Sequence, residues 1–478
     1  MPNLKLWQTR LFFLILFLIP SNLAKHFLIP SSYVSGILVD YLIPTLYLTD
    51  IFIILLLILW LVEKLSENQQ IGIWRYDRNL ISPSVKLLLL FLVLLSPSIT
   101  FAFSFIPAFY KYLKFLELSL FVFWIKQNIS LKTLFSNIIN VLTTSVLFQS
   151  LLALAQWLKQ SSIFGYSFLG EQPYTLSTPS IDKITWFDGS LKIPPMGTFP
   201  HPNILAGFII SIFPLILFSL LKSQPSSKIR WFYFATLITS TITLFLTFSL
   251  SSWLALLLIG LPLTFIFYKQ PSHIYQRTQQ LSLIKNLPRF KSWQKIINQQ
   301  AGNPVHDRKL RFPSVRFILI YTGLLLIFLS FSTKFSFLAP QSSFSRRSQL
   351  ATISLNIIKD NPLTGIGLNN FTTVMEKYGF ITATTRFFQP VHNIYLLILS
   401  ETGIIGFIGF LILFLYPIYL NLKKPRSLFF IPFLSLLFIG LFDHYILTIQ
   451  QGILLFFLFL ILSTFSPKPQ SPTNTNLS

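Results

Sequence analysis

A histidine and an asparagine stand side by side toward the C-terminal end of the chain, at the start of a long apolar run. They are His392 and Asn393, within the stretch Val-His-Asn-Ile-Tyr-Leu. A neutral imidazole can take a proton from a hydroxyl group, and such general-base catalysis contributes roughly 10² to 10⁴ in rate. A lone histidine at the mouth of a helix is more often an interfacial residue with satisfied hydrogen bonds, so its neighbours must support a chemical role.

Arginines precede this pair, in a stretch that separates two apolar runs. Arg346 and Arg347 stand near its beginning, and Arg386 lies shortly before His392. A guanidinium can bind a phosphate through two parallel hydrogen bonds, and it keeps its charge at every physiological pH. These residues could therefore bind a phosphate or another oxyanion.

Other polar residues stand where apolar runs begin or are interrupted. His201 and Asn203 precede an apolar run, where they can cap the free backbone amides of a helix. Glu401 lies inside another run, and a buried hydrogen bond explains it first and catalysis second. Asp443 and His444 are adjacent, and a salt-bridged cap explains this pair better than a proton relay.

The segments between these residues have the composition of a membrane protein. Of the 478 residues, 53% are hydrophobic and 11% are charged, whereas a soluble domain carries about 25% charged residues. Apolar runs recur from Leu11 to Phe465, each near the roughly 20 residues that cross a hydrocarbon core. The runs lack the alternation of a barrel, so we predict an all-α polytopic transmembrane bundle of about twelve spans.

The charge of the chain is strongly positive, with a formal net charge of +23. The longest basic segment, residues 269–315, lies between two apolar runs and contains a single acidic residue, Asp307. Because positively charged loops stay on the cytoplasmic side during insertion, topology and contact with membrane lipids explain this charge better than nucleic acid does. Alternation of spans from this segment places both termini in the cytoplasm. We expect a multi-pass protein of the plasma or inner membrane.

Two outer segments are long enough to carry a site, residues 159–200 and 332–391. Within the second, helical spacing of apolar residues predicts a helix over 347–361. It would lie at the outer membrane interface with its apolar face toward lipid, or else cover the bundle as a surface helix. We expect residues 1–466 to form one membrane domain and the polar tail 467–478 to be disordered.

Three motifs combine these residues in one order. The first is Gly-Thr-Phe-Pro-His-Pro-Asn-Ile-Leu-Ala-Gly at 197–207. The second leads from Arg347 to Asn-Pro-Leu-Thr-Gly-Ile-Gly-Leu-Asn-Asn-Phe at 361–371, and the third is the His-Asn stretch followed by Glu-Thr-Gly-Ile-Ile-Gly at 401–406. In order, spacing and membrane setting they resemble the O-antigen ligase and O-antigen polymerase superfamily of bacterial membrane glycan transferases, over most of 197–409.

This resemblance implies a glycosyltransferase that moves a glycan from a polyprenyl-diphosphate donor to a hydroxyl of a glycan, lipid or protein acceptor, on the outer face of the membrane and with inversion. Ligation and polymerisation both remain open. The resemblance assigns the acceptor hydroxyl to His392 and the diphosphate to Arg347. Substrate-binding roles are expected for Arg346, Arg386, His201, Asn203, Asn393 and Glu401. No cofactor or metal is expected where enough cations converge on the diphosphate.

One position departs from the family pattern. The family places a second diphosphate-binding arginine in a Thr-X-Ser-Arg stretch at the start of a span, whereas this chain reads Thr-Phe-Ser-Leu, with Leu250 in the arginine's place. Arg346 or Arg386 could substitute for the missing arginine. Alternatively, the donor differs or the enzyme is impaired.

A multi-spanning transporter or flippase of a lipid-linked or anionic substrate is the alternative function. The many apolar runs favour it, as do the charged residues Lys111, Lys114 and Glu117 within a run. Internal repeats and midplane helix breaks, which transporters tend to have, are not evident. A non-catalytic assembly protein is a third possibility, supported by Leu250 alone.

The charge asymmetry predicts that Gln299 faces the cytoplasm and Thr373 the outside. Because the chain has no cysteine, single cysteines at these positions can be tested with a membrane-impermeant thiol reagent on intact cells. We expect Thr373→Cys to be labelled, and Gln299→Cys to react only after permeabilisation. If only Gln299→Cys is labelled from outside, the topology is the opposite of the predicted one, and the proposed site residues do not face the outside.

Overall fold

The computed structural model describes most of the chain in two units. The described residues are 2–71, 82–179, 181–186, 188–269, 323, 326, 341–379, 388–423 and 427–465. The first unit comprises residues 1–264 and 338–478, and the second comprises 265–337. Residues 270–315 of the predicted basic segment, Arg386 and the polar tail lie outside the described residues, and the site described below lies in the first unit.

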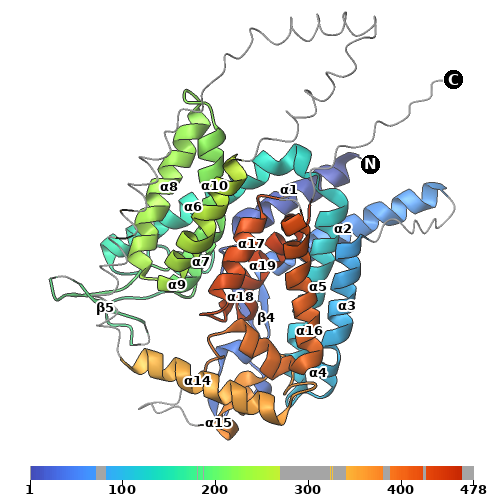
Figure 1. The fold of residues 1–478 in the computed structure, drawn as a ribbon, viewed down its shortest axis with the longest axis vertical. Helices are drawn as coiled ribbons and strands as arrows, with labels where there is room; N and C mark the ends of the chain where they lie inside the picture. Colours follow the sequence, from blue (N-terminus) through green and yellow to red (C-terminus); the bar gives the residue numbers. More distant parts are fainter. Residues whose placement is uncertain are drawn as a thin grey trace, which may run out of the picture. The chain divides into compact units, whose positions relative to one another are not determined.

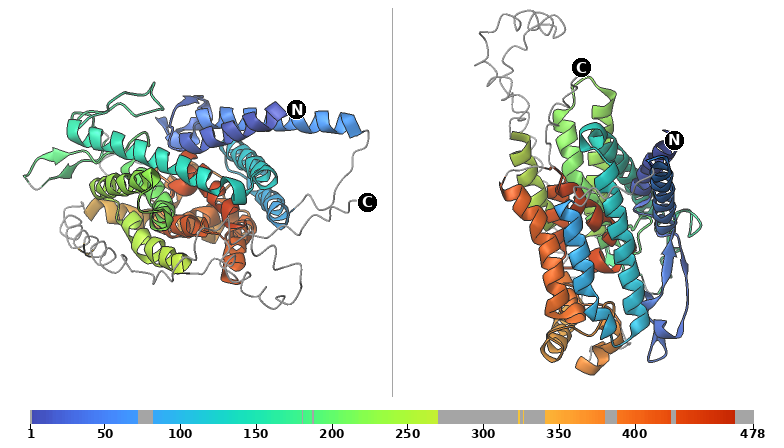
Figure 2. Two further views of the ribbon diagram at one scale, coloured as in Figure 1. Left: turned by 90° about the horizontal axis from the view of Figure 1, so that it is seen from above. Right: turned by 90° about the vertical axis from the view of Figure 1, so that its right-hand side faces the viewer.

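Helices make up most of the described chain. They are α1 (Pro2–Leu18), α2 (Leu48–Ile71), α3 (Pro83–Leu95), α4 (Pro97–Thr100), α5 (Phe105–Asn128), α6 (Leu131–Lys159), α7 (Pro202–Lys222), α8 (Lys228–Thr247), α9 (Leu250–Ala255), α10 (Leu261–Lys269), α14 (Gln341–Asp360), α15 (Phe371–Tyr378), α16 (Ile394–Lys423), α17 (Phe430–Ile439), α18 (Tyr445–Thr448) and α19 (Gln450–Ser463). Figure 1 shows their arrangement, and in Figure 2 α3, α5 and α16 run side by side.

Strands among the described residues form three short antiparallel pairs. These are β1 (Ala24–His26) with β4 (Thr45–Tyr47), β2 (Tyr33–Val34) with β3 (Ile37–Leu38), and β5 (Ile184–Thr185) with β6 (Leu191–Lys192). The first two pairs lie in the connection between α1 and α2, and the third lies between α6 and α7. Strands are therefore confined to connections, and the helices build the core.

Six described helical segments are long and apolar enough to cross a membrane. They cover residues 83–100, 134–159, 202–222, 228–247, 250–267 and 394–422, and α17 and α19 are shorter apolar helices. The prediction of a helical membrane protein is confirmed. The count of about twelve spans is not confirmed, because the described residues contain six such segments.

The charges in α5 form contacts inside the protein. Lys114 pairs with the buried Asp50 of α2, and Gln450 at the start of α19 donates a hydrogen bond to the same carboxylate. Glu117 lies 3.8 Å from Lys114. Because a buried ion is tolerated only when it is paired and hydrogen-bonded, this network holds α2, α5 and α19 together.

Helix α14 confirms that the predicted helical spacing forms a helix, which begins earlier than expected. Its apolar residues Leu350, Ile353 and Ile357 are almost fully buried, in a cluster with residues of α15 and α16. In Figure 1 α14 runs across one end of the bundle, beside α15. The apolar face of α14 therefore packs on protein and not on lipid, so α14 covers the bundle.

Glu401 fixes the turn that joins α14 to α15. Its carboxylate is buried and accepts hydrogen bonds from the backbone N–H groups of Asn369 (2.8 Å) and Phe371 (3.1 Å). Gly365 in this turn has a φ of 67°, and a Cβ there would lie 2.4 Å from the backbone carbon of Glu401. Only glycine fits this approach, so the turn packs directly on α16.

We expect Glu401→Ala to destabilise the protein, because it leaves two buried amides without an acceptor. The loss should be about 1 to 3 kcal/mol for each amide, measured by thermal or denaturant unfolding in detergent. The matched control is Glu376→Ala, which removes a carboxylate whose hydrogen bond from Ser35 is exposed. If both variants lose equal stability, the buried amides are not the cause.

Candidate functional site

His392 and Asn393 lie directly before α16. The side-chain oxygen of Asn393 accepts hydrogen bonds from the backbone N–H groups of Tyr395 (2.9 Å) and Leu396 (3.0 Å), so Asn393 caps the helix. Its amide nitrogen donates to the carbonyl of Leu441, at 3.1 Å. Asn393 thus fastens the start of α16 to the segment that follows α17, and this holds His392 in place beside that segment.

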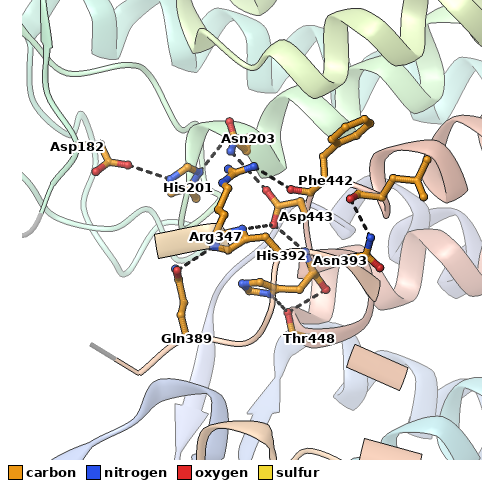
Figure 3. A network of polar contacts seen from close by, with 12 residues as sticks. Asp182, His201, Asn203, Arg347, Gln389, His392, Asn393, Phe442, Asp443 and Thr448 are labelled. Carbon is orange, nitrogen blue, oxygen red and sulfur yellow. Dashed lines mark hydrogen bonds and ion pairs between the residues drawn. The ribbon is translucent and has the colours of Figure 1, made fainter. Parts of the chain in front are cut away.

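Asp443, in the segment that follows α17, is where the polar contacts converge. Its side chain is 8% exposed, and Oδ1 lies 3.7 Å from Nδ1 of His392. Oδ1 also accepts the backbone N–H of His444 (2.8 Å), and Oδ2 accepts a hydrogen bond from the amide nitrogen of Asn203 (3.4 Å). Figure 3 shows the carboxylate between His392 and Asn203, which come from different parts of the chain.

His201 and Asn203 form the start of α7. Nδ1 of His201 accepts the backbone N–H of Asn203 at 3.1 Å, which is the expected cap. Nε2 of His201 lies 3.1 Å from a carboxylate oxygen of Asp182. The capping role leaves the side chain of Asn203 able to reach Asp443, so the start of α7 meets the segment after α17.

Arg347 reaches the same place from α14. Its Nη1 donates a hydrogen bond to the carbonyl of Phe442, at 3.1 Å, directly before Asp443 in the chain. Arg346 lies near Asp182, in the segment 159–200. The hydrogen bond to His201 lowers the pKa of Asp182, and the charge of Arg346 lowers it further.

The imidazole of His392 has two further neighbours. Its Nε2 lies 2.9 Å from the side-chain oxygen of Gln389, and its ring centroid lies 5.0 Å from that of His444. The ring of His444 in turn meets the ring of Tyr41 edge-on, with centroids 5.4 Å apart. Nδ1 of His444 lies 2.7 Å from the hydroxyl of Thr448. The connection between α1 and α2 therefore contributes a residue to the surroundings of the site.

The electrostatic environment separates the charge states of Asp443 and His444. Burial acts to raise the pKa of Asp443, but the side chains of His392 and His444 beside the carboxylate outweigh it and hold that pKa below its ordinary value. Burial lowers the pKa of His444 to about 3. At neutral pH Asp443 is a carboxylate and His444 is a neutral imidazole.

Comparison with known proteins identifies part of the chain. Residues 235–411 match the family model described as O-antigen ligase. This segment therefore resembles the O-antigen ligase family. The resemblance to the O-antigen ligase and polymerase superfamily is confirmed, and the family implies an O-antigen ligase-like glycosyltransferase in a membrane. No curated protein matches the chain.

The O-antigen ligase segment holds Arg347 and His392 but not all of the site. Asn203 precedes it and Asp443 follows it, although both contact each other. The site is therefore completed by residues on both sides of the matched segment. Glu401 lies within the segment but bonds the turn before α15, away from Asp443.

Some neighbours of His392 were not expected from the sequence. Asp443 and His444 were interpreted as a cap, and nothing local linked them to His392. Gln389 stands three residues before His392, which was its only signal. No sequence signal pointed to Tyr41, because its contact with His444 depends on how the connection between α1 and α2 folds back toward α18.

Leu250, where the family has an arginine, begins α9. α8 ends at Thr247, and Phe248 after it has a left-handed φ of 54°, so the helix is interrupted directly before Leu250. The ring of Trp186, from the segment 159–200, packs edge-on against Phe248. Leu250 is 46% exposed, so the side chain at this position is accessible.

Proposed function

We propose that this protein is an O-antigen ligase-like glycosyltransferase that transfers a glycan from a polyprenyl diphosphate to an acceptor hydroxyl on the outer face of the membrane, with inversion and without a metal. The observation that carries the proposal is the convergence of His392, Arg347 and Asp443 (Figure 3). They come from three segments, and two of them lie in the family segment. The proposal covers both ligation and polymerisation.

His392 acts as the general base in this mechanism. With a proton on Nδ1 facing Asp443, the carboxylate orients the imidazole and stabilises the imidazolium that forms. Nε2 then takes the proton of the acceptor hydroxyl. The carboxamide of Gln389, now 2.9 Å from Nε2, occupies the position that this hydroxyl needs, so it turns aside when the acceptor binds.

The bond changes balance within this scheme. The acceptor oxygen gives its proton to Nε2 and attacks the anomeric carbon, while the bond from that carbon to the diphosphate breaks and its electron pair leaves with the diphosphate. Attack opposite to the leaving group inverts the anomeric configuration. His392 then releases the proton to solvent.

Arg347 stabilises the diphosphate as it leaves. The Phe442 carbonyl takes one of its several N–H donors, and this contact aims the guanidinium at the end of the bundle where Asp443 lies. Arg346, on the neighbouring position of α14, supplies a second cation in place of the missing family arginine. Cations in these positions make a metal unnecessary.

The transporter alternative loses its main support. Lys114 is paired with Asp50, and Lys111 donates a hydrogen bond to the backbone carbonyl of Thr448, at 3.3 Å. These charges bind one part of the protein to another. Packing therefore explains the contacts of both lysines.

We expect His392→Ala to lower turnover by roughly 10² to 10⁴, because the base is lost. Arg347→Lys should also lose turnover, because an ammonium cannot form the two parallel hydrogen bonds that a guanidinium forms with a diphosphate. The measurement is the release of polyprenyl diphosphate when purified protein is incubated with a polyprenyl-diphosphate oligosaccharide and an acceptor.

The control for these variants is His26→Ala, which removes an exposed imidazole that contacts Thr45 in the connection between α1 and α2. It should keep near-normal turnover. Near-normal turnover of a folded His392→Ala would contradict the mechanism, and Asp443 would then be the next residue to test.

The exposed position of Leu250 offers a second test. We expect Leu250→Arg to raise donor affinity or turnover, because one charge-assisted contact contributes about 1.5 to 3 kcal/mol. Leu250→Met is the apolar control and should change little. If Leu250→Arg loses activity while Leu250→Met keeps it, the pocket is built around an apolar group, and an altered donor is favoured over an impaired enzyme.

A further inference from the structure

The hydrogen bonds of Thr448 fix the proton position on His444. The Thr448 hydroxyl donates its single proton to the backbone carbonyl of His444, at 3.2 Å. Its oxygen therefore acts as acceptor for Nδ1 of His444, at 2.7 Å. Nδ1 of His444 therefore carries a proton, and in the neutral form of the imidazole Nε2 carries a lone pair.

His392 shows the complementary arrangement. Its Nε2 lies 2.9 Å from the side-chain oxygen of Gln389, which is an acceptor, so Nε2 carries the proton in this state. Nδ1 is then left with a lone pair. This atom is buried, has no hydrogen-bond partner among the described residues, and faces Oδ1 of Asp443 at 3.7 Å. A lone pair that faces a carboxylate is unfavourable unless a cation lies between them.

We propose that His392, His444 and Asp443 bind one divalent transition-metal cation of the Zn²⁺ class. One ring nitrogen of each histidine and one oxygen of Asp443 lie within 4.8 Å of one another. In a tetrahedral zinc site with bonds of about 2.1 Å, ligand atoms stand about 3.4 Å apart. The distances between the ligand atoms must therefore shorten by up to about 1.4 Å when the ion binds.

The chemistry of the three ligands selects the kind of ion. Two imidazoles and one carboxylate suit Zn²⁺, Co²⁺ or Ni²⁺, whereas Mg²⁺ and Ca²⁺ prefer oxygen ligands throughout. Histidines that bind a metal usually donate their other N–H to an acceptor, and Gln389 and Thr448 are such acceptors here. The charge of Asp443 offsets the repulsion that Arg347 exerts on the ion.

Metal binding would inhibit the transferase. An ion on Nδ1 of His392 keeps the proton on Nε2, so the imidazole cannot accept the proton of the acceptor hydroxyl. This consequence rests on the proposed function, whereas the binding itself does not. The same nitrogen faces Asp443 with a proton in the active state and with a metal in the inhibited state.

The binding test uses the purified full-length protein without donor. Titration with Co²⁺ should give visible absorption bands of a site with nitrogen ligands, saturating at about one ion per chain, and Zn²⁺ should remove them. We expect His444→Ala and the shape-conserving His444→Gln to weaken Co²⁺ binding at least tenfold, and His26→Ala to leave it unchanged. Undiminished binding by folded His444 variants would overturn the proposal.

A measurement on the wild-type protein keeps the proposal testable if the His444 variants do not fold. X-ray absorption of the Zn²⁺ complex should show two imidazoles and oxygen ligands. A spectrum with oxygen ligands alone would overturn the proposal.

The activity test separates the site from the mechanism. Zn²⁺ should inhibit release of polyprenyl diphosphate, a chelator should restore it, and Mg²⁺ should not inhibit. Relative to its own metal-free rate, His444→Gln should be at least tenfold less sensitive to Zn²⁺. Equal sensitivity would indicate that Zn²⁺ binds the diphosphate donor and would contradict the inhibitory site. Binding at the site without inhibition would support the metal site and overturn His392 as the base.

Discussion

The candidate site depends on one buried carboxylate that has to be satisfied. Asp443 remains ionised although its side chain is almost fully buried, because it accepts hydrogen bonds from Asn203 and from the backbone of His444 and faces His392. An unpaired buried carboxylate costs several kcal/mol. The starts of α7 and α16 and the segment after α17 are therefore drawn to one place.

The lysines of α5 hold the end of α18 and the start of α19, which follow Asp443 and His444 in the chain. Lys111 bonds the carbonyl at the end of α18, and Lys114 with Asp50 bonds Gln450 at the start of α19. Ile449, between α18 and α19, has an extended backbone, so the two helices are separated there. The contacts of α5 hold the helix ends on both sides of Ile449. Residues that suggested transport in the sequence thus fix the position of Asp443 and His444.

The same few groups can hold a proton or a cation, which connects the two proposals. His392 has Asp443 on one ring nitrogen and Gln389 on the other. A carboxamide offers either a donor or an acceptor, so it tolerates both neutral forms of the imidazole. A base that must change its protonation state needs such a tolerant neighbour, and this tolerance also makes the site open to a metal.

The sequence by itself determined the membrane class, the helix that became α14, and the family motifs, because hydrophobic spacing and motif residues are local properties. It also placed Asn203 and Asn393 at helix starts. Only the tertiary structure decided that Asp443 faces His392, that Glu401 serves the turn before α15, and that Gln389 and His444 border the imidazole. These contacts join segments far apart in the chain or depend on side-chain direction. No local pattern encodes them, because they follow from how buried polar groups find partners once the helices have packed.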